Sequence, residues 1–155
     1  MEKQFDGAID NPFLAVDKLI LDQSQKGDII IVDLHAEATS EKVAFGYYVD
    51  GRVTAMLGTH THVPTADLRV LPGGTAYMSD VGMTGDFNSV IGMAKDEPMQ
   101  RFLTRVSSAR FEPATGPATL CAVAVETDPA TGLAMQVGAV RLGGVLEQAK
   151  PAFWA

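Results

Sequence analysis

Two of the chain's three histidines lie one residue apart in the segment Gly58-Thr-His60-Thr-His62, directly after an apolar run. In an extended segment, residues i and i+2 point to the same side, so both imidazoles can face one metal ion or two adjacent ions. The third histidine, His35, also follows an apolar run. Because imidazole nitrogen is a common metal ligand, His35, His60 and His62 are the candidate ligands of a metal site.

Carboxylates stand close to these histidines in the sequence. Asp33 and Glu37 flank His35, and Asp67 and Asp80 follow the histidine pair. They could be ligands, or they could accept the outer N–H groups of ligating imidazoles. Two ordinary roles remain open: Glu37 can charge the first turn of a helix, and Asp67 and Asp80 can be turn residues.

Other classes of histidine enzyme fit less well. Cupins have a glycine six residues before the first histidine and a glutamate four or five residues after the second. Thr54 stands at the glycine position, and Ala66 and Asp67 stand at the acid positions. Barrel amidohydrolases need a far longer chain. A structural α/β domain whose histidines bind nothing remains an alternative.

The elements around the histidines predict one βαβ unit. Asp10-Asn11-Pro12 is a start signal for a helix over residues 12–24. The run 28–34 predicts a strand buried on both faces. A helix capped by residues 39–41 then runs to Asp50-Gly51, and a strand over 53–57 follows. The two strands are expected to be parallel with a right-handed crossover. Ligand sites of α/β sheets lie beyond the carboxyl ends of strands, where the histidines stand.

The rest of the chain predicts shorter elements. Residues 68–71 and 75–78 flank Pro72-Gly73-Gly74 as a hairpin, and 80–95 form a glycine-rich loop. A helix is expected over 97–105, with a second hairpin formed by 118–127 and 133–141. We find no linker, so residues 1–155 are expected to form a single α/β domain.

Composition limits the partners. The chain has 155 residues, a net charge of −7, and 46% apolar residues. This acidic balance argues against an extended nucleic-acid groove, although a small phosphate ligand remains compatible with a bound cation. The lone Cys121 lies in an apolar run and is expected to be a small core residue. The opening segment has no signal-peptide pattern and no run is long enough to span a membrane, so we expect a cytoplasmic protein.

Four motifs together resemble one family. VDLHAEATSEK (32–42), GTHTHV (58–63), LPGGTAY (71–77) and DVGMTG (80–85) are similar, in order and spacing, to the bacterial YmdB-type metallophosphoesterases. These are calcineurin-like enzymes that hydrolyse phosphodiesters, 2′,3′-cyclic nucleotides among them. The resemblance extends from about residue 10 through residue 104, and more loosely over the last two strands. It implies the calcineurin-like α/β sandwich.

The resemblance also implies a dinuclear metal site. His35 and His60 match ligands of one ion, and His62 matches a ligand of the other. The expected metals are iron or manganese. Two adjacent cations would hold the phosphate oxygens while a metal-activated hydroxide attacks phosphorus in line. The implied substrate is a small phosphodiester or cyclic nucleotide.

The family's opening strand with Gly-Asp, its glutamate-bearing segment and its asparagine–histidine pair have no match here. The chain thus resembles only the C-terminal part of the enzyme and is expected to lack its N-terminal strands, and no catalytic residue is assigned. Three imidazoles can hold one ion, but two close cations require bridging anions. We therefore expect little activity from this chain alone; a non-catalytic metal-binding or interaction module is the alternative. Apolar sheet surface left exposed would favour a homo-oligomer.

Overall fold

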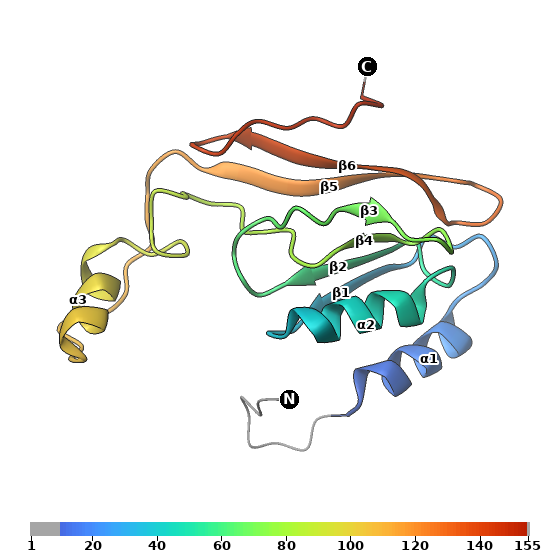
Figure 1. The fold of residues 1–155 in the computed structure, drawn as a ribbon, viewed down its shortest axis with the longest axis horizontal. Coiled ribbons are helices and arrows are strands. Elements are labelled where there is room, and N and C mark those ends of the chain that lie inside the picture. Colours follow the sequence, from blue (N-terminus) through green and yellow to red (C-terminus); the bar gives the residue numbers. More distant parts are fainter. Residues whose placement is uncertain (1–9, 155) are drawn as a thin grey trace.

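The computed structural model describes residues 10–154, which form a four-stranded sheet with helices on one face and a two-stranded hairpin on the other (Figure 1). The polar opening segment, on which the sequence prediction of no signal peptide depends, lies outside the described residues. Within the described part, no helix has the length and apolar character needed to cross a membrane.

Helix α1 (Pro12–Gln23) begins where the sequence predicts. The Asn11 side chain accepts a hydrogen bond from the Phe13 amide at 2.9 Å, which satisfies one of the free N–H groups of the first turn. Pro12 occupies the first helical position, where its missing N–H costs nothing. The helix covers the sheet with Val16, which is buried.

The predicted βαβ unit is confirmed. Strands β1 (Ile31–His35) and β2 (Ala55–Thr59) are parallel, with register from Ile31 opposite Ala55 to His35 opposite Thr59. Helix α2 (Thr39–Val49) connects them. The capping prediction for this helix is wrong, because Ala38 is the N-cap residue and no side chain caps it.

The sheet is completed by the first hairpin. Strand β4 (Ala76–Met78) is parallel to β2, and β3 (Arg69–Val70) is antiparallel to β4, as the hairpin prediction requires. The strand order is β1-β2-β4-β3. Neighbouring residues on a strand face opposite sides of the sheet. Met56 and Tyr77 therefore pack with the helices, whereas Ala55 and Ala76 pack towards the second hairpin.

Strand β1 differs from its prediction. It lies at the end of the sheet in the described chain, and alternate residues are exposed, with Ile31 at 56%. A groove lined by apolar residues of α1 and of the segment 29–34 runs beside it. A continuous apolar run indicates that a strand packs against apolar surface, but it does not say what covers the strand's second face. The expectation of burial on both faces is therefore wrong here.

The last part of the chain follows the sequence prediction closely. Strands β5 (Thr119–Thr127) and β6 (Ala134–Gly143) pair as an antiparallel hairpin, and Cys121 is buried in it. Helix α3 (Asp96–Thr104) lies apart from the sheet, at the left of Figure 1. The segment 80–95 between β4 and α3 is a loop without a helix, as the sequence predicts.

Candidate metal centre

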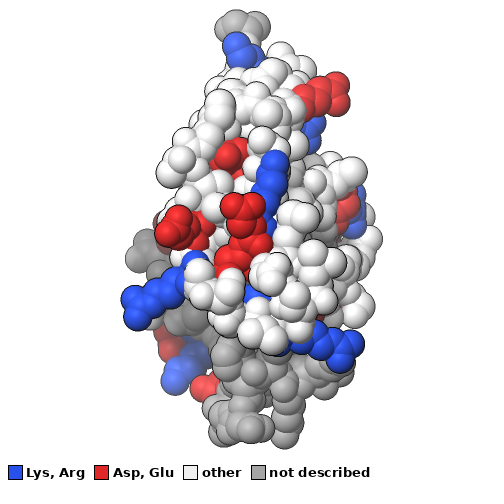
Figure 2. All heavy atoms as spheres, turned by 90° about the vertical axis from the view of Figure 1, so that its left-hand side faces the viewer, with Lys and Arg blue, Asp and Glu red and all other residues white. Residues whose placement is uncertain are grey.

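The histidines meet at the carboxyl end of the parallel sheet. His35 is the last residue of β1, and His60 directly follows β2, whose final residue Thr59 pairs with His35. This edge lies on the side of the molecule seen in Figure 2, where acidic and basic side chains are interspersed. The βαβ geometry thus brings together two residues that are 25 positions apart.

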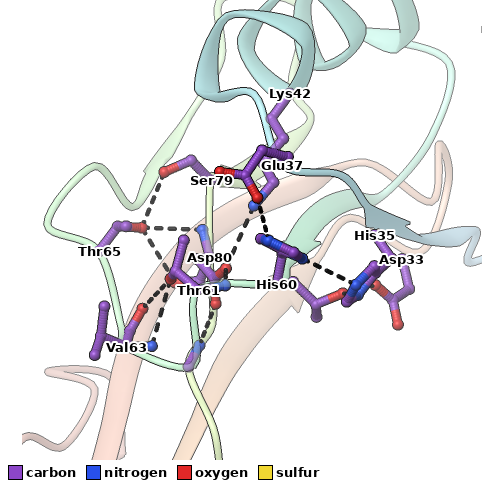
Figure 3. Close-up of polar contacts among 12 residues, drawn as sticks. Asp33, His35, Glu37, Lys42, His60, Thr61, Val63, Thr65, Ser79 and Asp80 are labelled. Carbon is purple, nitrogen blue, oxygen red and sulfur yellow. Dashed lines mark hydrogen bonds and ion pairs between the residues drawn. The ribbon is translucent and has the colours of Figure 1, made fainter. Parts of the chain in front are cut away.

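The two imidazoles are in direct contact (Figure 3). His60 Nδ1 lies 3.2 Å from His35 Nε2, and the rings meet edge to face with centroids 5.1 Å apart. The other nitrogen of each ring has its own partner. The Glu37 carboxylate contacts His60 Nε2, and the Thr59 hydroxyl lies 3.0 Å from His35 Nδ1.

These outer partners fix the tautomers. The Glu37 carboxylate accepts, so His60 carries its proton on Nε2. The Thr59 hydroxyl donates to Asp33 at 3.0 Å and therefore accepts from the Nδ1–H of His35. In the neutral pair, His35 Nε2 and His60 Nδ1 then carry lone pairs that converge on one point. A metal ion between the two rings would be bound by both lone pairs.

The predicted third ligand is placed differently. His62 is exposed, and its side chain makes no hydrogen bond or ion pair within residues 10–154. The expectation that His60 and His62 project together from an extended segment is wrong, because φ is 147° at His60 and 66° at His62. The backbone turns between them, so the alternation of a strand does not apply.

Asp80 and Asp67 hold loops. Asp80 accepts hydrogen bonds from the backbone amides of Thr61 at 2.7 Å and Gly82 at 2.9 Å. Burial raises the pKa of Asp80, but these bonds and Lys42 outweigh it, so its pKa lies below the usual range. Asp67 accepts from the Thr65 hydroxyl and the Ser79 amide, which likewise lower its pKa against the effect of burial. The Asp80–Gly82 contact has the local turn geometry that the sequence left open, whereas Asp67 joins its own loop to the end of β4.

Sequence reasoning missed two residues of this region, Lys42 and Thr59. The Lys42 side chain is 2% exposed and pairs with the Asp80 carboxylate at 3.3 Å. A lysine in the second turn of a helix normally extends into solvent, and nothing in the spacing distinguishes this one. Thr59, whose hydroxyl contacts His35 Nδ1, was also missed, because nothing in the spacing distinguishes it.

The fold and these contacts define a class. The protein is a mixed α/β protein with an imidazole cluster at the carboxyl end of a parallel βαβ unit, the position at which α/β proteins bind ligands. A family model described as "YmdB-like protein" matches residues 1–140. The chain belongs to this YmdB-like family.

Three relatives illustrate the relationship. The 2′,3′-cyclic-nucleotide 2′-phosphodiesterase of Bacillus subtilis is 47% identical over 129 residues, which cover 83% of this chain and 48% of the relative. A crystal structure of a hypothetical protein from Thermus thermophilus matches with TM-score 0.80 and 41% identity over 90% of this chain and 53% of that one. A crystal structure of a novel phosphatase from Mycoplasma pneumoniae matches with TM-score 0.76 and 42% identity, over 92% of this chain and 48% of that one.

The chain thus spans about half the length of the relatives it matches. The metallophosphoesterase family implies metal ions, and the residues present fit such a group in part. The converging nitrogens of His35 and His60 lie 3.2 Å apart, a separation that one ion bound at about 2.0–2.1 Å from each nitrogen accommodates. However, no group of three His, Cys, Asp or Glu side chains suited to a metal occurs in the part of the chain that the structure describes.

Proposed function

We propose that this protein takes part in metal-dependent hydrolysis of small phosphodiesters, with 2′,3′-cyclic nucleotides as the substrate class. The family and the activity named for the Bacillus subtilis relative support the reaction type. The observation that carries the proposal for this chain is the convergence of His35 Nε2 and His60 Nδ1 at the carboxyl end of the sheet.

The chain's own residues have separate roles in this proposal. His35 and His60 bind one ion through their facing nitrogens, while Glu37 and the Thr59–Asp33 pair hold the outer N–H groups. Outer partners of this kind fix ring orientation and raise the basicity of the ligand. His62, which is exposed and apart from this pair, is the residue that the family resemblance gives to a second ion, and we propose that this chain alone does not hold that ion. Iron or manganese ions, when bound, supply positive charge for the phosphoryl oxygens and make bound water more acidic.

This chain supplies only part of such a site. Two imidazole nitrogens leave at least half of an ion's coordination positions open. The other ligands of this ion must come from groups outside the His35–His60 pair. The net charge of −7 also repels a phosphate ligand when no cation is bound. We therefore propose that the 155-residue chain binds one ion and turns over cyclic nucleotides poorly by itself.

The test measures manganese retained after dialysis, together with hydrolysis of 2′,3′-cyclic AMP. We expect about one ion per wild-type chain, loss of that ion in the His35→Ala/His60→Ala double variant, and full retention in Asn11→Ala, which lies outside the site. The Bacillus subtilis relative serves as the positive control for turnover. Equal manganese in wild type and the double variant would exclude the proposed site.

A second candidate is a non-catalytic metal-binding module. It is favoured by one observation, the cluster of only two imidazoles in a chain of half the family's length. The same experiment distinguishes the two. A stoichiometric ion together with turnover no greater than that of the double variant supports the module, whereas turnover that depends on His60 supports the enzyme.

A further inference from the structure

A buried ion pair lies next to the loop that carries His60 and His62. Lys42 of α2 and Asp80, which follows β4, pair through Nζ and Oδ2 at 3.3 Å, and both side chains are only 2% exposed (Figure 3). A buried charge is retained only where it is paired and hydrogen-bonded. The position of this pair suggests a role, because the other two hydrogen bonds of the Asp80 carboxylate come from backbone amides next to the histidines, those of Thr61 and Gly82.

Asp80 joins two loops. Its Oδ2 accepts the Thr61 amide at 2.7 Å, and its Oδ1 accepts the Gly82 amide at 2.9 Å. The two loops are also joined by their backbones, since the amide of Met83 donates to the carbonyl of His62 at 3.1 Å. The Asp80 carboxylate therefore binds the backbone amide of Thr61, the residue between His60 and His62.

The backbone that Asp80 holds is strained. His60 and His62 both have positive φ, at 147° and 66°, values that residues with a side chain adopt only rarely. Such conformations persist where the surrounding structure over-determines them. The hydrogen bond from the Thr61 amide to the Asp80 carboxylate is the contact best placed to hold this conformation, because Thr61 lies between His60 and His62.

We propose that Asp80, oriented by Lys42, is the positioning residue that sets the turn at His60–His62 and so directs His60 Nδ1 towards His35. The pair acts through the backbone of Thr61, and neither residue contacts either imidazole. The consequence for metal binding rests on the function proposed above. The consequence for the loop itself does not, since it concerns the metal-free protein.

Asp80→Asn is the direct test. If the asparagine NH2 group takes the place of Oδ2, it faces both the Thr61 amide and Lys42. If it takes the place of Oδ1, it faces the Gly82 amide, and the bond to Thr61 loses its charge. Asp50→Asn is the matched control, because Asp50 also accepts two backbone amides, those of Gly73 at 2.7 Å and Thr75 at 3.2 Å. These amides precede β4, at the end of the sheet opposite the histidines. The control therefore reports the general cost of losing such a carboxylate.

Two readouts separate positioning from stability. In the metal-free protein, below the unfolding transition, we expect hydrogen exchange of the Thr61 amide to be about 10- to 100-fold faster in Asp80→Asn, the size of effect that loss of a charged hydrogen bond gives. The Zn²⁺ dissociation constant should rise about tenfold or more. Asp50→Asn should leave both readouts at the wild-type values.

Each outcome decides the inference. Wild-type exchange at Thr61 in Asp80→Asn, or an equal change in Asp50→Asn, overturns it. If Asp80→Asn does not fold, Lys42→Met replaces it: this variant keeps the carboxylate but removes its orienting partner, and wild-type exchange at Thr61 there overturns the inference equally. If wild type binds neither Zn²⁺ nor Mn²⁺, the proposed metal function fails, while the exchange result still judges the role of Asp80.

Discussion

Replacing Gly58 with alanine should destabilise the protein strongly and at a defined place. Gly58 lies in β2, two residues before His60. A Cβ at this position would lie 2.0 Å from the Ser79 carbonyl oxygen and 3.0 Å from Lys42 Cδ. Real Cβ atoms essentially never approach another atom closer than 3.0 Å, so the two segments must separate by about 1 Å. Since the obstacle is backbone, no side-chain rotation can relieve it.

We expect a loss of about 3 kcal/mol in the free energy of unfolding, the upper end of the usual cost of overpacking. For a chain of this size that loss lowers the melting temperature by roughly 6–12 °C. Urea denaturation followed by circular dichroism measures both the free energy and its slope. Because Asp80 follows Ser79 directly, the shift should also speed exchange of the Thr61 amide.

Gly85→Ala is the matched control for this prediction. A Cβ there has nothing closer than Met83 Sδ at 3.8 Å, an ordinary contact, so we expect a change within about 0.5 kcal/mol. If Gly58→Ala and Gly85→Ala unfold at the same urea concentration, the close approach of β2 to Ser79 is wrong. The position of Asp80 against the Thr61 amide, which depends on that approach, is then wrong as well.

Three further predictions concern other parts of the chain. The buried hydroxyl of Tyr77 has no hydrogen-bond partner among the described residues, so Tyr77→Phe should raise the free energy of unfolding by about 1 kcal/mol in urea denaturation; a loss of 1 kcal/mol would contradict this. Hydrogen bonds from Ser108 and Arg101 lower the pKa of Glu97 from 4.5 to about 2. Its folded pKa is therefore the lower one, and its stabilising effect should be complete above pH 4.5 and fade towards pH 2. The protection of the Ser108 amide, its exchange rate compared with the intrinsic rate at each pH, should fall from pH 4.5 towards pH 2 in wild type, whereas Glu97→Gln should show no such fall. Asn11→Ala should lower the unfolding free energy by about 1 kcal/mol through loss of the α1 cap, and an unchanged urea midpoint would contradict that role.

Local patterns predicted most of the fold. The cap at Asn11, the βαβ unit and both hairpins follow from short-range signals, namely capping residues, periodicity and turn residues, and the structure has them. The juxtaposition of His35 with His60 follows as well, because parallel strands carry the residues after them to the same edge. These features depend on interactions within a few residues or on one pairing of strands.

Other features depend on tertiary contacts that the sequence does not encode locally. Lys42 is buried because Asp80, 38 residues away, lies opposite it. The turn at His60–His62 has positive φ at residues that normally avoid it, which no propensity scale anticipates, so the histidine spacing alone predicts an extended segment. The exposure of β1 depends on its place at the end of the sheet, and an apolar run alone does not reveal that place.

The central claim is that His35 and His60 present two lone pairs to one cation. The most direct test follows the imidazole nitrogens of the folded chain by ¹⁵N NMR during titration with Zn²⁺. The account predicts that His35 Nε2 and His60 Nδ1 move together to metal-bound shifts, while His35 Nδ1 and His60 Nε2 stay protonated against Thr59 and Glu37. Unchanged shifts at both inner nitrogens, or binding through the outer ones, would contradict it.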